Sequence, residues 1–412
     1  MNTSFERIKR DIENLSMYNQ TPELGCTRPS YSKEDRKARD YLLREMKRQG
    51  LKITIDGIGN IRGKLEGKNP DFPAIMTGSH IDTVLKGGKY DGIVGVVGGL
   101  EVIRTIKENA LKLNHPIELV IFSEEEGANF GITTAGSKAL VGEYCLGDIK
   151  NIKNSKGISY YEILKDFGLD PDTIDDTKLK SSDIKAMIEL HIEQSVVLEK
   201  KRKSIGIVKG IAGRRAYSIE LTGESNHAGA TPMNLRKDPM VVAGKIISSI
   251  NQVVKENGLD TTVATVGKID CQPNVSNIIA HRVRFTVDIR DVENDAMDHV
   301  LNGLKSLVRN VADESKVDYH IECIGESNGI LLSEDIVNTI EEVVNENNIF
   351  YCKMNSGAVH DAALLAKLVD VGMIFIPSKD GRSHVPEEYT SYEDIQQGCD
   401  VLLKTILRLD KM

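Results

Sequence analysis

Histidine and aspartate residues occur together in two glycine-containing motifs of the N-terminal part of the chain. His80 and Asp82 lie in GSHIDTV, and Asp91 follows in GGKYDGIVG. Imidazole nitrogens and carboxylate oxygens are the ligands that zinc and similar divalent cations take. Residues two apart on an extended strand point to the same face, so Asp82 is placed to orient the His80 ring from behind a metal site. The same fragment also fits a core histidine beside turn aspartates, and by itself it leaves both interpretations open.

Three adjacent glutamates, Glu124, Glu125 and Glu126, follow the apolar segment ELVIFS. A run of charges usually marks a solvated face, and three converging carboxylates repel one another unless a cation is present. These glutamates follow a predicted buried strand, and open α/β sheets bind ligands at the carboxyl ends of their strands. His191 in ELHIEQ and His384 in GRSHVPEE also lie at or after apolar strands. Together these residues have the composition of a two-metal hydrolytic site.

The motifs are positioned by an alternation of predicted helices and strands. Ser32 is a suitable N-cap for a helix at 32–50, and an apolar helix is expected at 93–108 after a glycine-rich turn. Short segments bounded by turn residues predict strands at 51–56, 61–67, 73–80, 116–123 and 186–191. Strands that alternate with helices predict an α/β sheet covered on both faces.

The pattern changes near residue 210. The segment that follows contains four expected strands and two expected helices, at 214–223, 238–257, 261–270, 282–291, 296–315 and 317–325. Their order, β-α-β-β-α-β, predicts an α+β unit of ferredoxin-like type. Helix and strand alternation then resumes with 330–348, 371–378 and a closing helix. We therefore expect a large α/β domain at 1–209 and 327–412, interrupted by a smaller inserted domain at 210–326.

The composition argues against several classes of protein. The chain has 412 residues, of which 40% are hydrophobic, and a net charge of −8, which suits two domains. No window approaches the ~18 apolar residues of a membrane span, and the first residues carry charges where a signal peptide is apolar. No basic block is interleaved with aromatic residues, and the six cysteines include no C-x-x-C pair. We expect a cytoplasmic protein with reduced thiols and with neither a membrane nor a nucleic acid as partner.

Eight motifs in order resemble those of a known family. They are GSHIDTV, GGKYDG, SEEEGANF, ELHIEQ, NHAGATPMNLRKD, NVSNIIAHRVRFTVDIRD, SGAVHDA and GRSHVPEE. Over nearly its full length the chain resembles the M20 metallohydrolases, in the branch of dinuclear amidases that contains N-carbamoyl-L-amino-acid hydrolase, β-ureidopropionase and allantoate amidohydrolase. It departs from the family at Val359, where a glycine is common, and at Asn274 and Ser276 in the loop before a predicted strand.

The resemblance implies a site with two divalent metal ions per subunit, of zinc, manganese or cobalt. His80, Asp91 and His191 would hold one ion, and Asp91 would bridge to a second ion held by Glu126 and His384. Glu125 matches the general base of the family, and Glu124 would be its neighbour. A bridging carboxylate reduces the repulsion between two such cations, which agrees with this arrangement.

The resemblance also gives roles to residues elsewhere in the chain. The inserted domain would serve as a dimerisation and lid domain, and His227 would reach from the partner subunit to stabilise the oxyanion, so that activity requires a homodimer. Asn277 and Arg290 would together grip the substrate carboxylate, a task that suits a guanidinium. Gln194 and His360 match substrate-contacting positions.

Three functions remain open at this point. The first is metal-dependent hydrolysis of the ureido C–N bond of an N-carbamoyl-L-amino acid or a related small ureido acid, with release of ammonia and carbon dioxide; allantoate is the alternative substrate. The second is a peptidase or aminoacylase of the wider M20 group. The third is a metal-binding dimeric scaffold without activity, which the presence of Glu125 beside all five candidate ligands disfavours.

Overall fold

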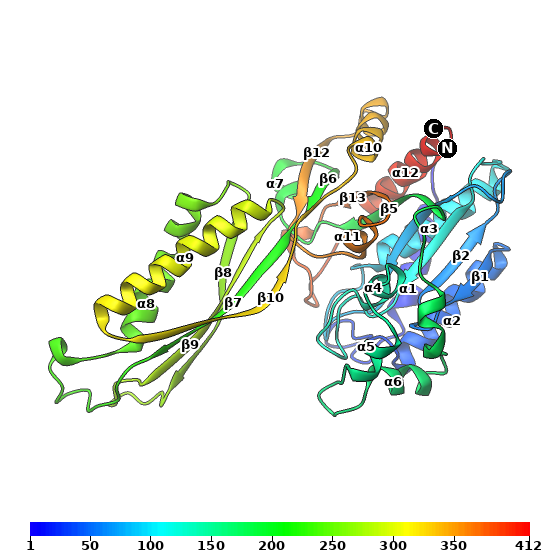
Figure 1. Ribbon diagram of the computed structural model, residues 1–412. Coiled ribbons are helices and arrows are strands. Elements are labelled where there is room, and N and C mark those ends of the chain that lie inside the picture. Colours follow the sequence, from blue (N-terminus) through cyan, green and yellow to red (C-terminus); the bar gives the residue numbers. More distant parts are fainter. The chain divides into compact units, whose positions relative to one another are not determined.

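The computed structural model describes residues 1–412 and divides the chain into two compact units (Figure 1). The first unit contains residues 1–209, 332–356 and 360–412, and the second contains residues 210–331 and 357–359. The second unit ends at Leu331 rather than at the expected residue 326, because the short strand β11 (Ile330–Leu331) pairs with Gly210 and Ile211. No helix combines the length and the apolar character needed to cross a membrane.

The first unit is built on a mixed sheet whose central strands are parallel. β4, β3, β5 and β13 lie side by side in that order and run in the same direction, while β2 and β6 join them antiparallel. The strands are β1 (Lys52–Ile55), β2 (Ile61–Leu65), β3 (Ala74–His80), β4 (Ile117–Phe122), β5 (Ile184–Ile192), β6 (Ile205–Ile211), β12 (Tyr351–Ser356) and β13 (Asp370–Ile376). The expected α/β fold is confirmed.

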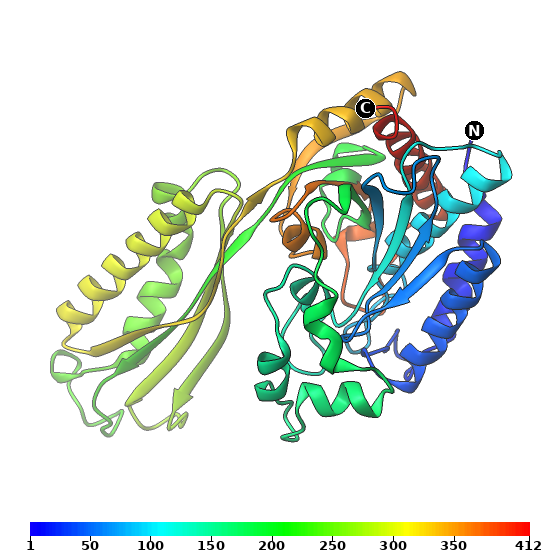
Figure 2. The same ribbon diagram turned by 45° about the vertical axis from the view of Figure 1, so that its right-hand side comes forward.

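Helices cover this sheet and fix the direction of its side chains. The helices α1, α3 and α12 pack on one another (Figure 2). The Leu190 side chain of β5 lies near Gly98 of α3 and Gly398 of α12. Successive residues of a strand point to opposite faces, so His191 points away from that helical layer. The helices are α1 (Phe5–Ser16), α2 (Lys33–Arg48), α3 (Ile93–Glu108), α4 (Ala135–Leu140), α5 (Leu146–Asn151), α6 (Tyr160–Asp166), α7 (Val197–Lys201), α10 (Glu334–Glu346), α11 (Asp361–Leu365) and α12 (Tyr392–Leu409).

The second unit has the expected ferredoxin-like topology. Its elements are β7 (Gly213–Thr222), α8 (Pro239–Asn257), β8 (Val263–Gln272), β9 (Arg282–Asp291), α9 (Asn294–Ser315) and β10 (Asp318–Ser327). The four strands form an antiparallel sheet in the order β10-β7-β9-β8. Alternate residues of β9 are buried in one core with residues of α8 and α9, and the two helices lie side by side on one face (Figure 1).

Candidate metal centre and active site

The candidate ligands gather at the carboxyl ends of the parallel strands. His80 is the last residue of β3, the three glutamates follow β4, and His191 is the second-last residue of β5. β3 lies between β4 and β5 in the sheet. The chain therefore adds β4 on one side of β3 and later adds β5 on its other side. Such a reversal of strand order opens a crevice outside the carboxyl ends, which is where open α/β sheets bind ligands.

Asp91 is at the centre of this group. Its Oδ1 lies 3.5 Å from His80 Nε2 and 3.2 Å from His191 Nε2, and its Oδ2 lies 3.3 Å from His384 Nε2. His384 Nε2 also lies 3.5 Å from Glu126 Oε2. The two oxygens of one carboxylate therefore face two different sets of ligands, His80 with His191 and Glu126 with His384, as a bridging aspartate requires.

The ring orientations show that this group fits a divalent metal. Nδ1 of His80 lies 3.0 Å from the carbonyl oxygen of Asp82, and Nδ1 of His191 lies 2.9 Å from the carbonyl oxygen of Ile192. A carbonyl oxygen only accepts, so each Nδ1 carries a proton, and Nε2 is left as the ring atom that would bind a metal beside Asp91. A proton on Nε2 or a metal ion would balance the charge of the carboxylate that both rings face.

Asp82 acts differently from the expectation drawn from its spacing. Its carbonyl oxygen orients the His80 ring, whereas its Oδ1 lies 3.7 Å from Nδ1. The carboxylate instead accepts hydrogen bonds from the backbone N–H groups of Glu125 and Glu126, at 3.3 and 3.1 Å. Asp82 thereby connects the end of β3 to the turn that presents the two glutamates.

The buried charges of the site shift one another's ionisation. Burial raises the pKa of Glu125 well above its usual range, against the opposing effect of His80. Burial and the charge of Asp91 raise the pKa of Glu126 to about 7. The hydrogen bond to Asp91 raises the pKa of His384 to about 9. Each shift reflects a concentration of carboxylates that positive charge stabilises.

The three adjacent glutamates have different surroundings. Glu125 Oε2 lies 3.8 Å from His80 Nε2, and Glu126 faces His384. Glu124 has a left-handed backbone, with φ 51°, and its carboxylate accepts hydrogen bonds from the backbone and side-chain N–H groups of Asn129, at 2.8 and 2.7 Å. Glu124 therefore does not join the groups that could hold a metal.

Gln194 and His360 lie beside the candidate ligands. The Nε2 of Gln194 donates to Asp91 Oδ2 at 2.6 Å, and its Oε1 is buried without a hydrogen-bond partner. The His360 ring packs edge-on against the His191 ring, with centroids 4.6 Å apart, and its Nε2 lies 2.9 Å from Ser356 Oγ. Gln194 is thus a contact of the bridging carboxylate in addition to a candidate substrate contact.

Ser383 and Glu388 contact the bridging aspartate and were missed from the sequence. The Ser383 hydroxyl lies 2.8 Å from Asp91 Oδ2, and Glu388 accepts hydrogen bonds from the backbone N–H groups of Tyr90 and Asp91. Both residues belong to GRSHVPEE, the motif that contains His384. The sequence motif indicated that this loop lies at the site, but it did not show which of its polar residues contact Asp91.

The second unit holds the other three expected residues at two separate places. His227 forms an isolated β-bridge with Ile278, and Asn277 accepts a hydrogen bond from the backbone N–H of Ala228 at 3.0 Å, so His227 and Asn277 are neighbours. Arg290 is near the opposite end of β9, where its guanidinium contacts Asp288 and the carbonyl oxygen of Gly357, each at 2.9 Å.

The length of β9 separates these two places. The loops that carry His227 and Asn277 lie beyond the end where Arg282 pairs with Thr222, whereas Arg290 pairs with Arg214. Eight residues of strand span roughly 27 Å at 3.3 to 3.4 Å per residue. Asn277 and Arg290 of one chain therefore do not form the pair around a single carboxylate that the resemblance implied.

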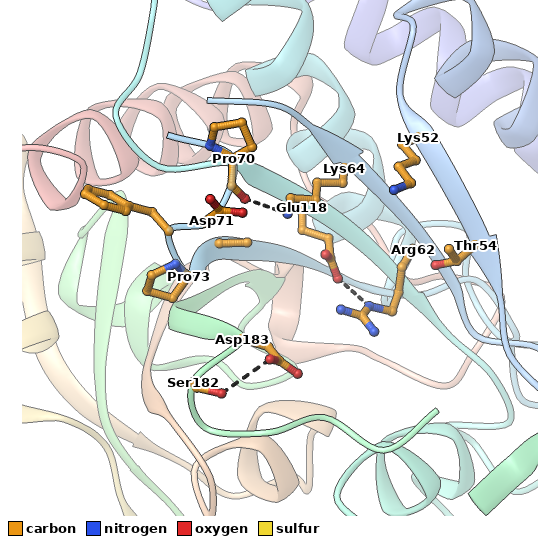
Figure 3. Close-up of a pocket in the computed structure, with 12 residues that line it drawn as sticks. Lys52, Thr54, Arg62, Lys64, Pro70, Asp71, Pro73, Glu118, Ser182 and Asp183 are labelled. Atoms are coloured by element: carbon orange, nitrogen blue, oxygen red, sulfur yellow. Dashed lines mark hydrogen bonds and ion pairs between the residues drawn. The ribbon is translucent and has the colours of Figure 1, made fainter. Parts of the chain in front are cut away.

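A separate cleft of about 320 Å³ lies in the first unit over β1, β2 and β4 (Figure 3). Lys52, Arg62 and Lys64 line it together with three carboxylates, Asp71, Glu118 and Asp183. Arg62 forms a salt bridge with Glu118. The cations of this cleft are balanced by carboxylates of its own lining, so the cleft does not match an anion site.

Imidazole and carboxylate groups around a central aspartate, at the carboxyl ends of an α/β sheet, are typical of a metal-dependent hydrolase. The chain belongs to peptidase family M20/M25/M40, whose family model matches residues 76–408. The predicted family membership is confirmed.

The relatives and solved structures agree over the whole chain. An N-carbamoyl-L-amino-acid amidohydrolase of Pseudomonas sp. (strain NS671) is 38% identical over 407 residues, which cover 98% of each protein. The allantoate amidohydrolase of Escherichia coli (strain K12) is 34% identical, with 98% of each protein covered. A crystal structure of an amidase of the hydantoinase/carbamoylase family from Burkholderia multivorans superposes with a TM-score of 0.94 at 32% identity, covering 100% of this chain and 99% of that one.

The position of His80 yields a test with a matched control. Gly92 has φ 67°, and a Cβ added there would lie 2.5 Å from Nε2 and Cε1 of His80. Gly131 has φ 69°, and a Cβ added there would have no neighbour within 4 Å. Both substitutions, Gly92→Ala and Gly131→Ala, strain the backbone, because both glycines have a positive φ that L-residues rarely adopt. Only Gly92→Ala should also weaken zinc binding, by roughly 10- to 100-fold, because it displaces a ligand.

Zinc titration of the two chelated variants, together with their thermal unfolding, checks this prediction. Equal zinc affinity in the two variants would show that the His80 ring does not contribute to a metal site.

Proposed function

We propose that the chain hydrolyses the ureido C–N bond of an N-carbamoyl-L-amino acid, with the amino acid, ammonia and carbon dioxide as products. The observation that carries this proposal is the buried carboxylate of Glu125 beside a histidine and aspartate cluster divided between the two oxygens of Asp91. The names of the relatives support the substrate class. The wider peptidase function is the alternative that the description of the family names.

The ligand sets follow from the faces of Asp91. His80, His191 and Asp91 Oδ1 would hold one divalent ion, and Glu126, His384 and Asp91 Oδ2 would hold the other. Zinc, manganese and cobalt all accept such ligands. Ions held there would polarise the scissile carbonyl and lower the pKa of the attacking water.

Glu125 is the proposed proton carrier. As water attacks the ureido carbon, Glu125 takes its proton and then gives a proton to the leaving nitrogen, so that ammonia departs as the C–N bond breaks. The remaining carbamate decomposes to carbon dioxide and the amino acid. Burial raises the pKa of this carboxyl, which makes its protonated form accessible for the second transfer.

Gln194 supplies an acceptor for the ureido group. Its Nε2 is engaged by Asp91, which directs the buried and unpartnered Oε1 away from that carboxylate. A buried acceptor without a donor is costly, and an N–H group of a ureido substrate would satisfy it.

His227 is oriented as a hydrogen-bond donor. Its Nδ1 accepts from the backbone N–H groups of Gly229 and Ala230, at 3.1 and 3.2 Å, so the proton of the neutral ring resides on Nε2. An exposed Nε2–H suits the stabilisation of an oxyanion that develops on the substrate carbonyl. We assign this role to His227.

The separation along β9 favours a site built from two chains. We assign Arg290, whose guanidinium contacts the carbonyl oxygen of Gly357, to the substrate carboxylate, as the family resemblance implies. His227 and Asn277 lie at the other end of β9 and would then be contributed by a second copy in a homodimer.

Allantoate is the second candidate substrate, favoured by the Escherichia coli relative. Allantoate also offers a ureido carbonyl and a carboxylate, so the same residues would act on it.

The substrate assignment predicts ammonia release in a defined panel. Carbamoyl-L-amino acids, β-ureidopropionate and allantoate should be incubated with the full-length enzyme before and after chelation. We expect the highest kcat/KM for a carbamoyl-L-amino acid, loss of turnover after chelation, and recovery when divalent metal is returned. Higher kcat/KM for allantoate would select the second candidate, and full turnover by protein that elemental analysis shows to be metal-free would overturn both.

Glu125→Gln should lower kcat by roughly 10² to 10⁴ or more while the metal content stays unchanged, because it removes a proton acceptor but no ligand. Glu124→Gln is the matched control, since Glu124 is buried in the same turn and bonds to Asn129 instead. Kinetics and elemental analysis of both variants check the assignment. If Glu124→Gln were inactive and Glu125→Gln fully active, the roles of the two adjacent carboxylates would have to be exchanged.

Mixing two inactive variants tests the two-chain site. His227→Ala and Glu125→Gln subunits, exchanged by mild dissociation and reassociation, should regain up to about half of the wild-type activity per hybrid dimer, because one of its two sites has both residues intact. Labelled subunits verify that exchange has occurred. Proven exchange without recovery would mean that each chain completes its own site.

A further inference from the structure

Two loops that are distant in the sequence meet at the bridging aspartate. The loop between β3 and α3 carries Tyr90 and Asp91, and the loop after β13 carries Ser383 and Glu388. Glu388 is 6% exposed, and its Oε1 accepts hydrogen bonds from the backbone N–H groups of Tyr90 and Asp91, at 3.0 and 3.1 Å. Its Oε2 lies 2.9 Å from the Ser383 hydroxyl.

The Ser383 hydroxyl lies between two carboxylates. It is 2.8 Å from Asp91 Oδ2 and 2.9 Å from Glu388 Oε2. A hydroxyl has one proton and donates to one of the two groups, while its oxygen accepts from the other when that carboxyl group is protonated, so it connects the two groups at a fixed separation. Glu388 thus fixes the backbone of Asp91, and Ser383 fixes its side chain.

The surrounding loop is shaped to receive Glu388. A Cβ added at Gly88 would lie between 2.1 and 2.4 Å from the side-chain atoms of Glu388. Only a residue without a side chain allows the carboxylate to reach the two backbone N–H groups. A buried carboxylate is expensive unless hydrogen bonds compensate it, and Glu388 has three such contacts.

The side-chain contact of Ser383 is confined to one half of the cluster. Ser383 touches the Oδ2 of Asp91, the oxygen that faces His384, and precedes His384 in the chain. The rings of His80 and His191 are instead held by carbonyl oxygens at the ends of β3 and β5. Loss of the Ser383 hydroxyl should therefore disturb the Oδ2 side and leave the Oδ1 side in place, whereas loss of Glu388 also frees the backbone of Asp91.

We propose that Ser383 and Glu388 are a positioning pair that joins the bridging aspartate to the loop of His384, and that they are required for tight binding of the metal ion on the Oδ2 side of Asp91. This inference rests on the proposed two-metal function. Neither residue acts on the substrate; the pair acts through Asp91 and His384.

The test is a zinc titration of the full-length chelated protein against a chromophoric chelator, which resolves two successive affinities. Ser383→Ala removes the hydroxyl, and Glu388→Leu removes the acceptor of the two backbone N–H groups and of Ser383. Ser383→Ala should bind the first zinc ion within twofold of wild type and the second roughly 10- to 100-fold more weakly, and Glu388→Leu should weaken the second by at least as much. Ser383→Thr, which keeps a hydroxyl, should restore the second affinity.

Glu387→Gln is the matched control, because Glu387 is the adjacent carboxylate, is exposed, and lies 3.9 Å from Arg382. It should bind both zinc ions as wild type does. At zinc concentrations that fill both sites, Ser383→Ala should recover most of its kcat, which a misfolded chain would not do.

The remaining outcomes overturn the proposal in distinguishable ways. Two unaltered affinities in Ser383→Ala and Glu388→Leu, or an equal loss at both sites in Ser383→Ala, would overturn the positioning role alone. A wild-type chain that binds none of zinc, manganese and cobalt would overturn the proposed function and this inference together.

Discussion

Mutual repulsion among the groups that converge on Asp91 is the constraint on which the rest of the structure depends. Two imidazole rings and several carboxylates are buried close together, and each would be more stable in water. The fold holds them by attaching His80 and His191 to adjacent parallel strands and by giving Glu124, Gln194 and His384 left-handed backbones. Strain of this kind persists only where the surrounding structure enforces it. Hydrogen bonds contribute to that enforcement, since the backbone N–H groups of Glu124 and Gln194 donate to the hydroxyls of Ser30 and Ser378.

The types of residue at the site could be predicted from the sequence, but their contacts could not. Histidines and glutamates at the ends of apolar strands indicated a metal site, because strand ends are visible as changes in hydrophobic pattern. The bonds of Ser383 and Glu388 to the loop of Asp91 join residues about 300 positions apart, and no local pattern encodes them. The same limit explains Asp82, whose spacing indicated a face but not whether its carbonyl or its carboxylate would meet the ring.

The elements show a similar division. The helix expected at 93–108 has those bounds, and Ser32 caps α2 as expected, because both depend on neighbours in the sequence. The strands β6 and β12 and the helix α1 were not foreseen. β6 is a short apolar run that also fits a helix, and β12 exists only through its pairing with β6. Likewise, the resemblance to a family assigned Asn277 and Arg290 to one task, and only the register of β9 shows how far apart they lie within one chain.

β9 therefore fixes the distance between Arg290, near one end of the strand, and the loops of His227 and Asn277 beyond its other end. Its alternate residues are buried in the core with α8 and α9, so each side chain has a fixed face as well as a fixed distance. Removal of one residue from the strand would turn Arg290 to the opposite face. Removal of two would preserve the face and shorten the span by roughly 7 Å. The strand can therefore change its length only in steps of two residues without turning Arg290 to the other face. The loops at its ends have no such restriction, so they are the part of the second unit that can adapt to a longer or shorter substrate.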